Sequence, residues 1–259
     1  MSAIEHAIPS GFRRTLCIFG REFRGYFTTP LAGVFLVIFL FLTAFFTFNV
    51  GGLYERDQAD LRPFFQFHPW LYLFLVPAVS MRLWAEERRT GTIELLTTLP
   101  FTTANLVVGK FLAAWAFTTL ALLLTVPTWV TVSWLGDPDH GAIVVGYLAS
   151  ALLAGSFLAI GSVLSALTKN QVIAFVICAV VAFLVLLCGF PAVLDIVRGW
   201  MPGSAGDRLA VALSSMSALT HFDSLMRGVI DLRDVIYFGS VIIGCLYINV
   251  LVVDWKKAD

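Results

Sequence analysis

The chain has 259 residues, of which 59% are hydrophobic and only 13% are charged, and its formal net charge is zero. With a mean hydropathy of +0.87, it has too little polar surface to cover a soluble globular domain, and this composition is typical of an integral membrane protein. The lack of a net positive charge gives no reason to expect nucleic-acid binding.

Residues 11–28 predict an amphipathic helix that lies in the membrane interface. The apolar positions are Phe12, Leu16, Phe19, Phe23 and Tyr26 or Phe27, and the basic ones are Arg13, Arg14, Arg21 and Arg24. The two sets recur at helical spacing on opposite sides, which favours a helix with its arginines toward lipid phosphates. An ordinary basic flank that enforces topology is the alternative. No secretory signal is expected, because the first apolar run begins only at residue 31.

Six apolar runs predict six transmembrane helices, since about 20 apolar residues cross the hydrocarbon core. They cover residues 31–50, 64–81, 106–135, 142–167, 172–194 and 235–253, and the third can kink at Pro127. The runs are continuously apolar and lack the alternation of barrel strands, so the predicted fold is all-α. One transmembrane domain therefore occupies the whole chain.

Flanking charges predict the orientation of these spans. The N-terminal segment, the second and fourth loops and the C-terminus hold eleven of the 17 basic residues. The opposite side holds six, which are outnumbered there by ten acids. By the positive-inside rule we expect both termini in the cytoplasm, with the protein in the inner (plasma) membrane.

A dense charge cluster in segment 84–104, between the second and third spans, predicts contact with a cytoplasmic partner. Gly91 breaks a preceding helix, Thr92 can cap a new one and Pro100 ends it. The charged residues are Glu86, Glu87, Arg88, Arg89 and Glu94, and the apolar ones are Ile93, Leu95, Leu96 and Leu99. An apolar ridge rimmed by charges suits a groove on another protein. Packing of the ridge on the protein's own helices or among lipid headgroups fits the spacing equally well.

The same segment resembles the coupling loop of ABC-2-type transporter permeases. The resemblance rests on Glu86-Glu87, Gly91-Thr92, Glu94-Leu95-Leu96 and Pro100, followed by Gly109-Lys110 in the next helix. Six spans, an amphipathic helix before the first and a coupling helix between the second and third are the plan of that family. A narrower match, between His221 and Phe238, resembles permeases of the gliding-motility type.

The resemblance implies a non-catalytic membrane subunit of an ATP-driven transporter. ATP and Mg would bind to a separate ABC ATPase subunit, and this chain would carry no cofactor. A second copy of the permease, or a related permease, would complete the part embedded in the lipid bilayer, and an envelope subunit would join a gliding-type complex. The chain has no phosphate-binding loop, because Gly109-Lys110 is followed by Phe111 and Ala104 stands at the first glycine position.

Other classes of membrane protein fit these residues less well. Ser156 and Ser162 lack the surroundings of a protease nucleophile, and no zinc-protease motif occurs. Ala151, Gly155 and Ala159 instead predict close helix packing. A secondary transporter or channel usually needs ionisable groups in its spans, and the central parts of these spans contain none. Mechanical work on an envelope partner stays open as an alternative to export.

The outer segment, residues 195–234, predicts an extracytoplasmic hairpin that can fold back into the membrane. The resemblance implies an outer gate or a partner contact in which His221, Arg227, Asp231 and Asp234 are exposed. Local charge pairing that involves Asp223 and Arg233 is the alternative. The four cysteines lack metal-ligand spacing, so we expect no metal site.

Overall fold

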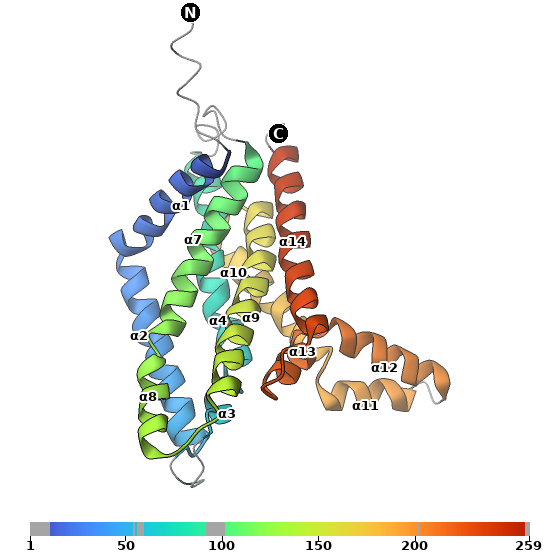
Figure 1. The fold of residues 1–259 in the computed structure, drawn as a ribbon. Helices are drawn as coiled ribbons and strands as arrows, with labels where there is room; N and C mark the ends of the chain where they lie inside the picture. Colours follow the sequence, from blue (N-terminus) through green and yellow to red (C-terminus); the bar gives the residue numbers. More distant parts are fainter. Residues whose placement is uncertain (1–10, 54, 56–59, 92–101, 201–202, 257–259) are drawn as a thin grey trace, which may run out of the picture.

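The computed structural model describes residues 11–53, 55, 60–91, 102–200 and 203–256, and these residues form helices and no strand (Figure 1). The first helices are α1 (Gly11–Thr28), α2 (Pro30–Phe45), the π-helical turn η2 (Phe46–Val50), α3 (Arg62–Phe65), α4 (His68–Ser80) and α5 (Arg82–Thr90). The later ones are α7 (Thr103–Leu123), α8 (Val126–Leu135), α9 (His140–Leu167), α10 (Gln171–Leu187), α11 (Pro191–Trp200), α12 (Ser204–Met216), α13 (Ala218–Leu225) and α14 (Leu232–Trp255). The predicted all-α fold is confirmed for this part of the chain.

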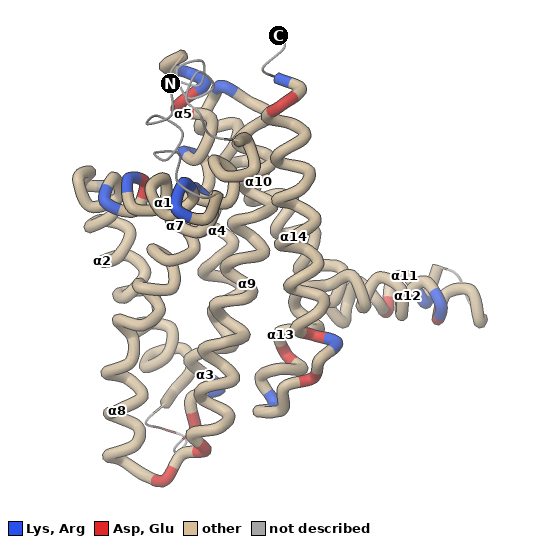
Figure 2. The backbone as a smooth tube through the Cα atoms, turned by 45° about the horizontal axis from the view of Figure 1, so that its top comes forward, with Lys and Arg blue, Asp and Glu red and all other residues tan. Residues whose placement is uncertain are grey.

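Among the described residues, five stretches of helix are long and apolar enough to cross a membrane. They are Ala32–Val50, Arg62–Thr90, Thr103–Leu135, His140–Leu167 and Leu232–Trp255. A sixth results only if α10 and α11, which meet at 69°, are counted as one span. Charged residues gather at the ends of the bundle and in the α11–α12 hairpin, while the bodies of the long helices are nearly free of them (Figure 2).

The predicted span 172–194 is not one straight helix, because α10 ends at Leu187 and α11 starts a new direction at Pro191. Gly189 lies in the bend, where a Cβ atom would come within 2.3 Å of the Ser217 hydroxyl oxygen. The close approach of α13 therefore fixes the point at which the chain turns. The α11–α12 hairpin then projects sideways from the bundle (Figure 1).

The third predicted span divides near its expected kink. α7 ends at Leu123 and α8 begins at Val126, with Pro127 in the first turn of α8, where proline needs no amide partner. Pro30 starts α2 in the same way. These proline positions were readable from the sequence because the ring acts on the local backbone.

Helix α9 runs through the centre of the bundle and packs against α4, α7, α10 and α14. Glycines on α9 allow these approaches: a Cβ atom at Gly146 would meet the Phe65 ring at 2.6 Å, and one at Gly155 would meet the Trp115 indole nitrogen at 2.9 Å. The indole N–H of Trp115 also donates to the Ala151 carbonyl oxygen at 2.8 Å. The predicted role of small residues in helix packing is confirmed here.

Candidate functional site

Helix α5 holds the charged segment and continues directly from the second span. The expected loop therefore begins later than predicted, because residues 84–90 are helical and the helix ends at Gly91, whose φ of 73° is left-handed. Glycine adopts that conformation without strain, which explains why the helix stops there. Residues 92–100, which include the predicted coupling helix, lie outside the described residues.

Hydrogen bonds to α9 fix the start of α5. The backbone amides of Trp84 and Ala85 donate to the Ser165 hydroxyl at 3.2 and 3.1 Å, and that hydroxyl donates to the Met81 carbonyl oxygen at 2.9 Å. The Trp84 indole donates to the Ser162 hydroxyl at 3.2 Å. The charged segment is thus attached to the central helix of the bundle.

A buried lysine joins the elements on either side of the predicted coupling segment. Lys110 on α7 is 2% exposed, and its Nζ lies 3.2 Å from Oε2 of Glu22 on α1 and 2.6 Å from Oε1 of Glu87 on α5. The ammonium also lies 5.5 Å from the centre of the Trp84 ring, within cation–π range. A single cation therefore connects α1, α5 and α7.

The charge balance of this cluster follows from its burial. Burial alone would raise the pKa of Glu22, but Lys110 and Arg21 together outweigh it and hold the pKa below its ordinary value. Two carboxylates share Lys110, so its removal would leave two acids facing one another without their common cation. We call Glu22, Glu87 and Lys110 the ion triad.

The other predicted contact residues on α5 differ in what they face. Glu86 accepts from Nε and Nη2 of Arg82 one turn earlier, at 2.8 and 3.3 Å. Arg88 donates to the Ala166 carbonyl oxygen at the end of α9. Arg89 is exposed. Glu87 faces the protein's own interior, so among these four Arg89 is the one most available to another protein.

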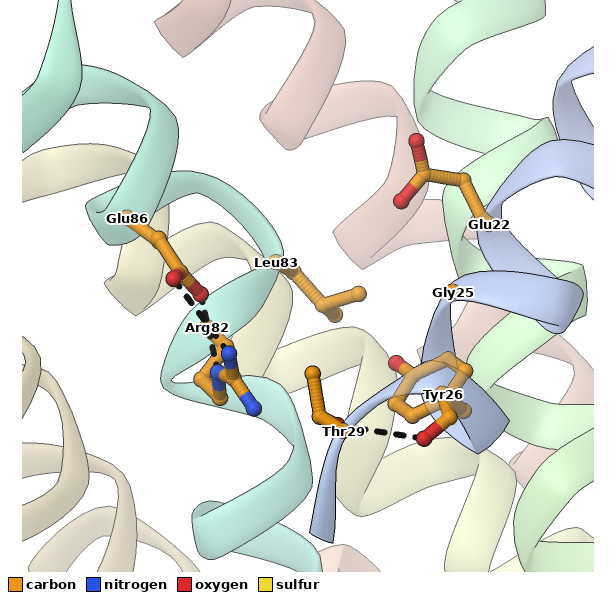
Figure 3. Close-up of a pocket in the computed structure, with 7 residues that line it drawn as sticks. All are labelled: Glu22, Gly25, Tyr26, Thr29, Arg82, Leu83 and Glu86. Carbon is orange, nitrogen blue, oxygen red and sulfur yellow. Dashed lines mark hydrogen bonds and ion pairs between the residues drawn. The ribbon is translucent and has the colours of Figure 1, made fainter. Parts of the chain in front are cut away.

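A polar pocket opens between α1 and α5 beside the ion triad (Figure 3). It has a volume of about 180 Å³ and is lined by Glu22, Gly25, Tyr26, Thr29, Arg82, Leu83 and Glu86. Burial, with the neighbouring Glu22 carboxylate, raises the pKa of Tyr26 well above its ordinary value, so its phenol stays neutral. The pocket therefore presents two carboxylates, one guanidinium and one neutral phenol.

At the other end of the bundle, two of the four predicted outer residues are buried, which corrects the expectation that all four are exposed. His221 Nδ1 lies 2.6 Å from Oδ1 of Asp234, and His221 Nε2 bonds the Ser215 carbonyl oxygen at 3.0 Å. Arg227 is exposed, and Asp231 caps α14 by accepting from the Arg233 amide at 2.9 Å. His221 and Asp234 therefore hold α12, α13 and α14 together.

Sequence reasoning missed several of these groups. Glu22 was not singled out among the arginines of α1, and Lys110 was interpreted as a flanking charge and as part of a family motif, without an acidic partner. His68 was left without a partner, yet it is fully buried in α4 and its Nδ1 lies 3.1 Å from the Ser150 hydroxyl. An acid on the basic face of a helix was the available signal for Glu22.

No group of three metal-ligating side chains occurs among the residues that the structure describes. Of the cysteines, Cys17 is exposed, Cys178 is buried and Cys188 and Cys245 are partly buried, each with a free thiol. His221 Nε2, the atom that would face a serine in a protease triad, is bonded to a backbone carbonyl. His221 is therefore not arranged as the base of a serine-protease triad.

Residues 70–253 match the model of the ABC-2 family transporter protein. The chain belongs to the ABC-2 transporter family. It is a multi-pass membrane protein and a membrane transport component, and members of this family generally work with an ABC ATPase. No curated protein that was compared matches the chain.

Proposed function

We propose that this ABC-2 family protein is the permease subunit of an ATP-driven transporter, coupled through segment 84–104 to a separate ATPase subunit that binds ATP and Mg. The observation that carries the proposal is the ion triad. Lys110 ties the helix that enters the segment, α5, to the helix that follows it, α7, and to α1. A push on the segment would therefore reach three elements through rigid contacts.

The arrangement of the helix ends supports the same proposal. The end of α5, the start of α7 and the ends of α9 and α14 lie at one end of the bundle (Figure 1). The Thr103 hydroxyl donates to Asp254 at 2.5 Å, and Lys256 Nζ donates to the Leu167 carbonyl oxygen at 2.9 Å. In our proposal this end is cytoplasmic and α1 is the interfacial helix, with exposed Phe12 and Leu16 in the lipid.

The complete transporter would contain more than one permease subunit. Two permease copies, or this chain with a related permease, would combine with two ATPases in the inner membrane. The segment from His221 to Phe238 favours the gliding-motility branch, in which an envelope subunit and mechanical work replace simple export. The exposed Arg227 and Asp231 are the outer residues available to such a partner.

The decisive experiment is purification of the tagged full chain from its native membrane. The wild-type chain should bring down an ATPase subunit, and Arg89→Glu or Leu95→Asp should release it while the permease stays folded. Glu87 is unsuitable for this test, because its reversal would also break the ion triad. Lys169→Glu, an exposed charge reversal in the loop between α9 and α10, is the matched control. Recovery of no ATPase with the wild-type chain would contradict the proposal, as would full, coupled recovery with both variants.

A further inference from the structure

An apolar groove between α2 and α4 lies beside the polar pocket between α1 and α5. The groove has a volume of about 120 Å³, and Tyr26 and Arg82 line both spaces. Its other lining residues are Ala32, Val34, Phe35, Ile38, Leu75, Ala78, Val79 and Phe117. One water needs only about 10–15 Å³ of such volume, so each space can take a larger group. The combined site is polar at one end and apolar at the other.

Arg82 stands at the junction of the two spaces. Its Nε and Nη2 are bonded to Glu86, whereas Nη1 has no hydrogen-bond partner among the described residues. A guanidinium with a donor left over binds a phosphate oxygen well. The junction therefore suits a phosphate.

The polar end also holds two carboxylates that are each paired with cations, Glu22 with Lys110 and Arg21, and Glu86 with Arg82. Glu22 and Glu86 both line it, with side chains 23% and 36% exposed. Each carboxylate oxygen has two lone pairs and can accept a further hydrogen bond beside its existing one. The remaining lone pairs of these acids favour a group that can donate N–H bonds, and the balance of charges favours a group without net charge.

The apolar end faces the bilayer. Val34 and Ile38 on α2 are 54% and 42% exposed, while Val79 on α4 and Phe117 on α7 form the buried wall. All three helices belong to stretches apolar enough to span a membrane. A hydrocarbon chain can therefore enter the groove from the lipid.

We propose that this composite pocket binds one membrane phospholipid with a primary ammonium headgroup, of the phosphatidylethanolamine class. The order of groups along such a lipid, ammonium then phosphate then acyl chain, matches the order of acids, Arg82 and apolar groove. An anionic headgroup would add negative charge beside two carboxylates, and a quaternary ammonium has no N–H to donate. The site shares Glu22 with the ion triad and Glu86 with the proposed ATPase contact, but lipid binding can be measured without the ATPase. The lipid would fill the space between α1, α2 and α4.

The test uses the purified full chain, equilibrated with equal amounts of phosphatidylethanolamine, phosphatidylcholine and phosphatidylglycerol that carry the same acyl chains. Lipid retained after detergent washing is identified by native mass spectrometry. We expect phosphatidylethanolamine to be enriched about tenfold over the other two, the factor that one additional charge-assisted hydrogen bond can supply. Arg82→Gln should lower the retention of all three lipids, because each carries the phosphate, and Ala78→Phe should abolish the enrichment by filling the groove.

Two matched controls separate this site from lipid adhesion in general. Arg24→Gln removes an exposed arginine of α1 outside the pocket, and Val180→Phe adds a ring to an exposed position of α10. Both should retain the enrichment. Equal retention of the three lipids by the wild-type chain, enrichment of the anionic lipid, or wild-type behaviour of the Ala78→Phe variant would overturn the proposal. Ala78→Phe decides the question if Arg82→Gln does not fold.

Discussion

Lys110 is a buried cation in an otherwise apolar helix, and its two acidic partners explain how it is tolerated there. An unpaired charge in this place would be costly, whereas a triad with good geometry and a facing aromatic ring recovers most of the desolvation penalty. Glu22 and Glu87 are 88 and 23 residues away from Lys110 in the chain. The triad can therefore form only when α1, α5 and α7 are correctly placed relative to one another, and its loss would indicate that they have moved.

Replacement Lys110→Met should destabilise the protein by about 1–3 kcal/mol, because it leaves two partly buried carboxylates without the cation that they share. The free energy of unfolding, measured by chemical denaturation in detergent micelles, tests this. Lys169→Met, at an exposed position, should change it by less than about 0.5 kcal/mol.

The triple variant Lys110→Met, Glu22→Gln, Glu87→Gln tests whether the loss of stability comes from the unpaired carboxylates. Because it removes the charges together, it should recover most of the loss. A Lys110→Met variant as stable as the wild-type chain would show that the triad contributes nothing to the folded state.

The buried ion pair of Asp234 with His221 should also contribute to the free energy of unfolding. Asp234→Ala leaves the buried His221 Nδ1 without its acceptor and should cost about 1–3 kcal/mol of unfolding free energy. Arg233→Ala, an exposed neighbour on the same helix, should leave it unchanged within about 0.5 kcal/mol. The same denaturation experiment checks both, and equal effects of the two variants would argue against a structural His221–Asp234 pair.

At the scale of the elements, the packing of α1 on α7 depends on one small residue. A Cβ atom at Gly109 would come within 2.7 Å of Ile18 Cγ2 and 3.2 Å of the Thr15 carbonyl oxygen. Gly109 therefore allows the approach, and Lys110 beside it supplies the ion pair with Glu22. The Gly109-Lys110 pair is thus explained by contact with α1 rather than by phosphate binding.

Gly109→Val should push α1 away from α7, since backbone as well as side-chain atoms stand in the way. We expect faster tryptic cleavage after Arg21 and Arg24 in detergent, followed by the appearance of the N-terminal fragments. Gly244→Val on α14, where a Cβ atom would meet nothing within 4 Å, is the control. Identical cleavage of the two variants and the wild-type chain would mean that α1 does not need this close contact.

At the scale of the whole molecule, an even number of crossings would place both ends of the chain on one side. The described chain begins in α1 and ends after α14 at the same end of the bundle, where the α5 and α7 termini also lie (Figure 1). Basic residues gather at that end (Figure 2), and this is why the proposed function places it in the cytoplasm.

Labelling of cysteines tests this orientation. Cys17 on α1 is the exposed one of the four thiols. A membrane-impermeant maleimide should label it only after cells are permeabilised, because α1 would lie on the cytoplasmic side. A Cys17→Ser variant that carries Asp137→Cys, in the exposed loop before α9, should be labelled in intact cells. Labelling of Cys17 in intact cells would reverse the proposed topology.

By itself, the sequence determined the membrane class, the all-α fold, the proline-marked helix starts at Pro30 and Pro127, and the break at Gly91. These features follow from composition and from local backbone restrictions, which act over a few residues. The bend after Leu187 was not readable, because it depends on α13 approaching Gly189 from elsewhere in the chain.

The candidate site was only partly predictable for the same reason. The charges of α5 were visible as a cluster, but the structure alone decided that Glu87 turns inward to Lys110, that Glu86 pairs with Arg82 and that His221 and Asp234 are buried. The sequence shows which side chains are charged, but tertiary packing determines which of them form ion pairs. Glu22 and Lys110, for example, are far apart in the chain and their charged atoms lie 3.2 Å apart in the fold.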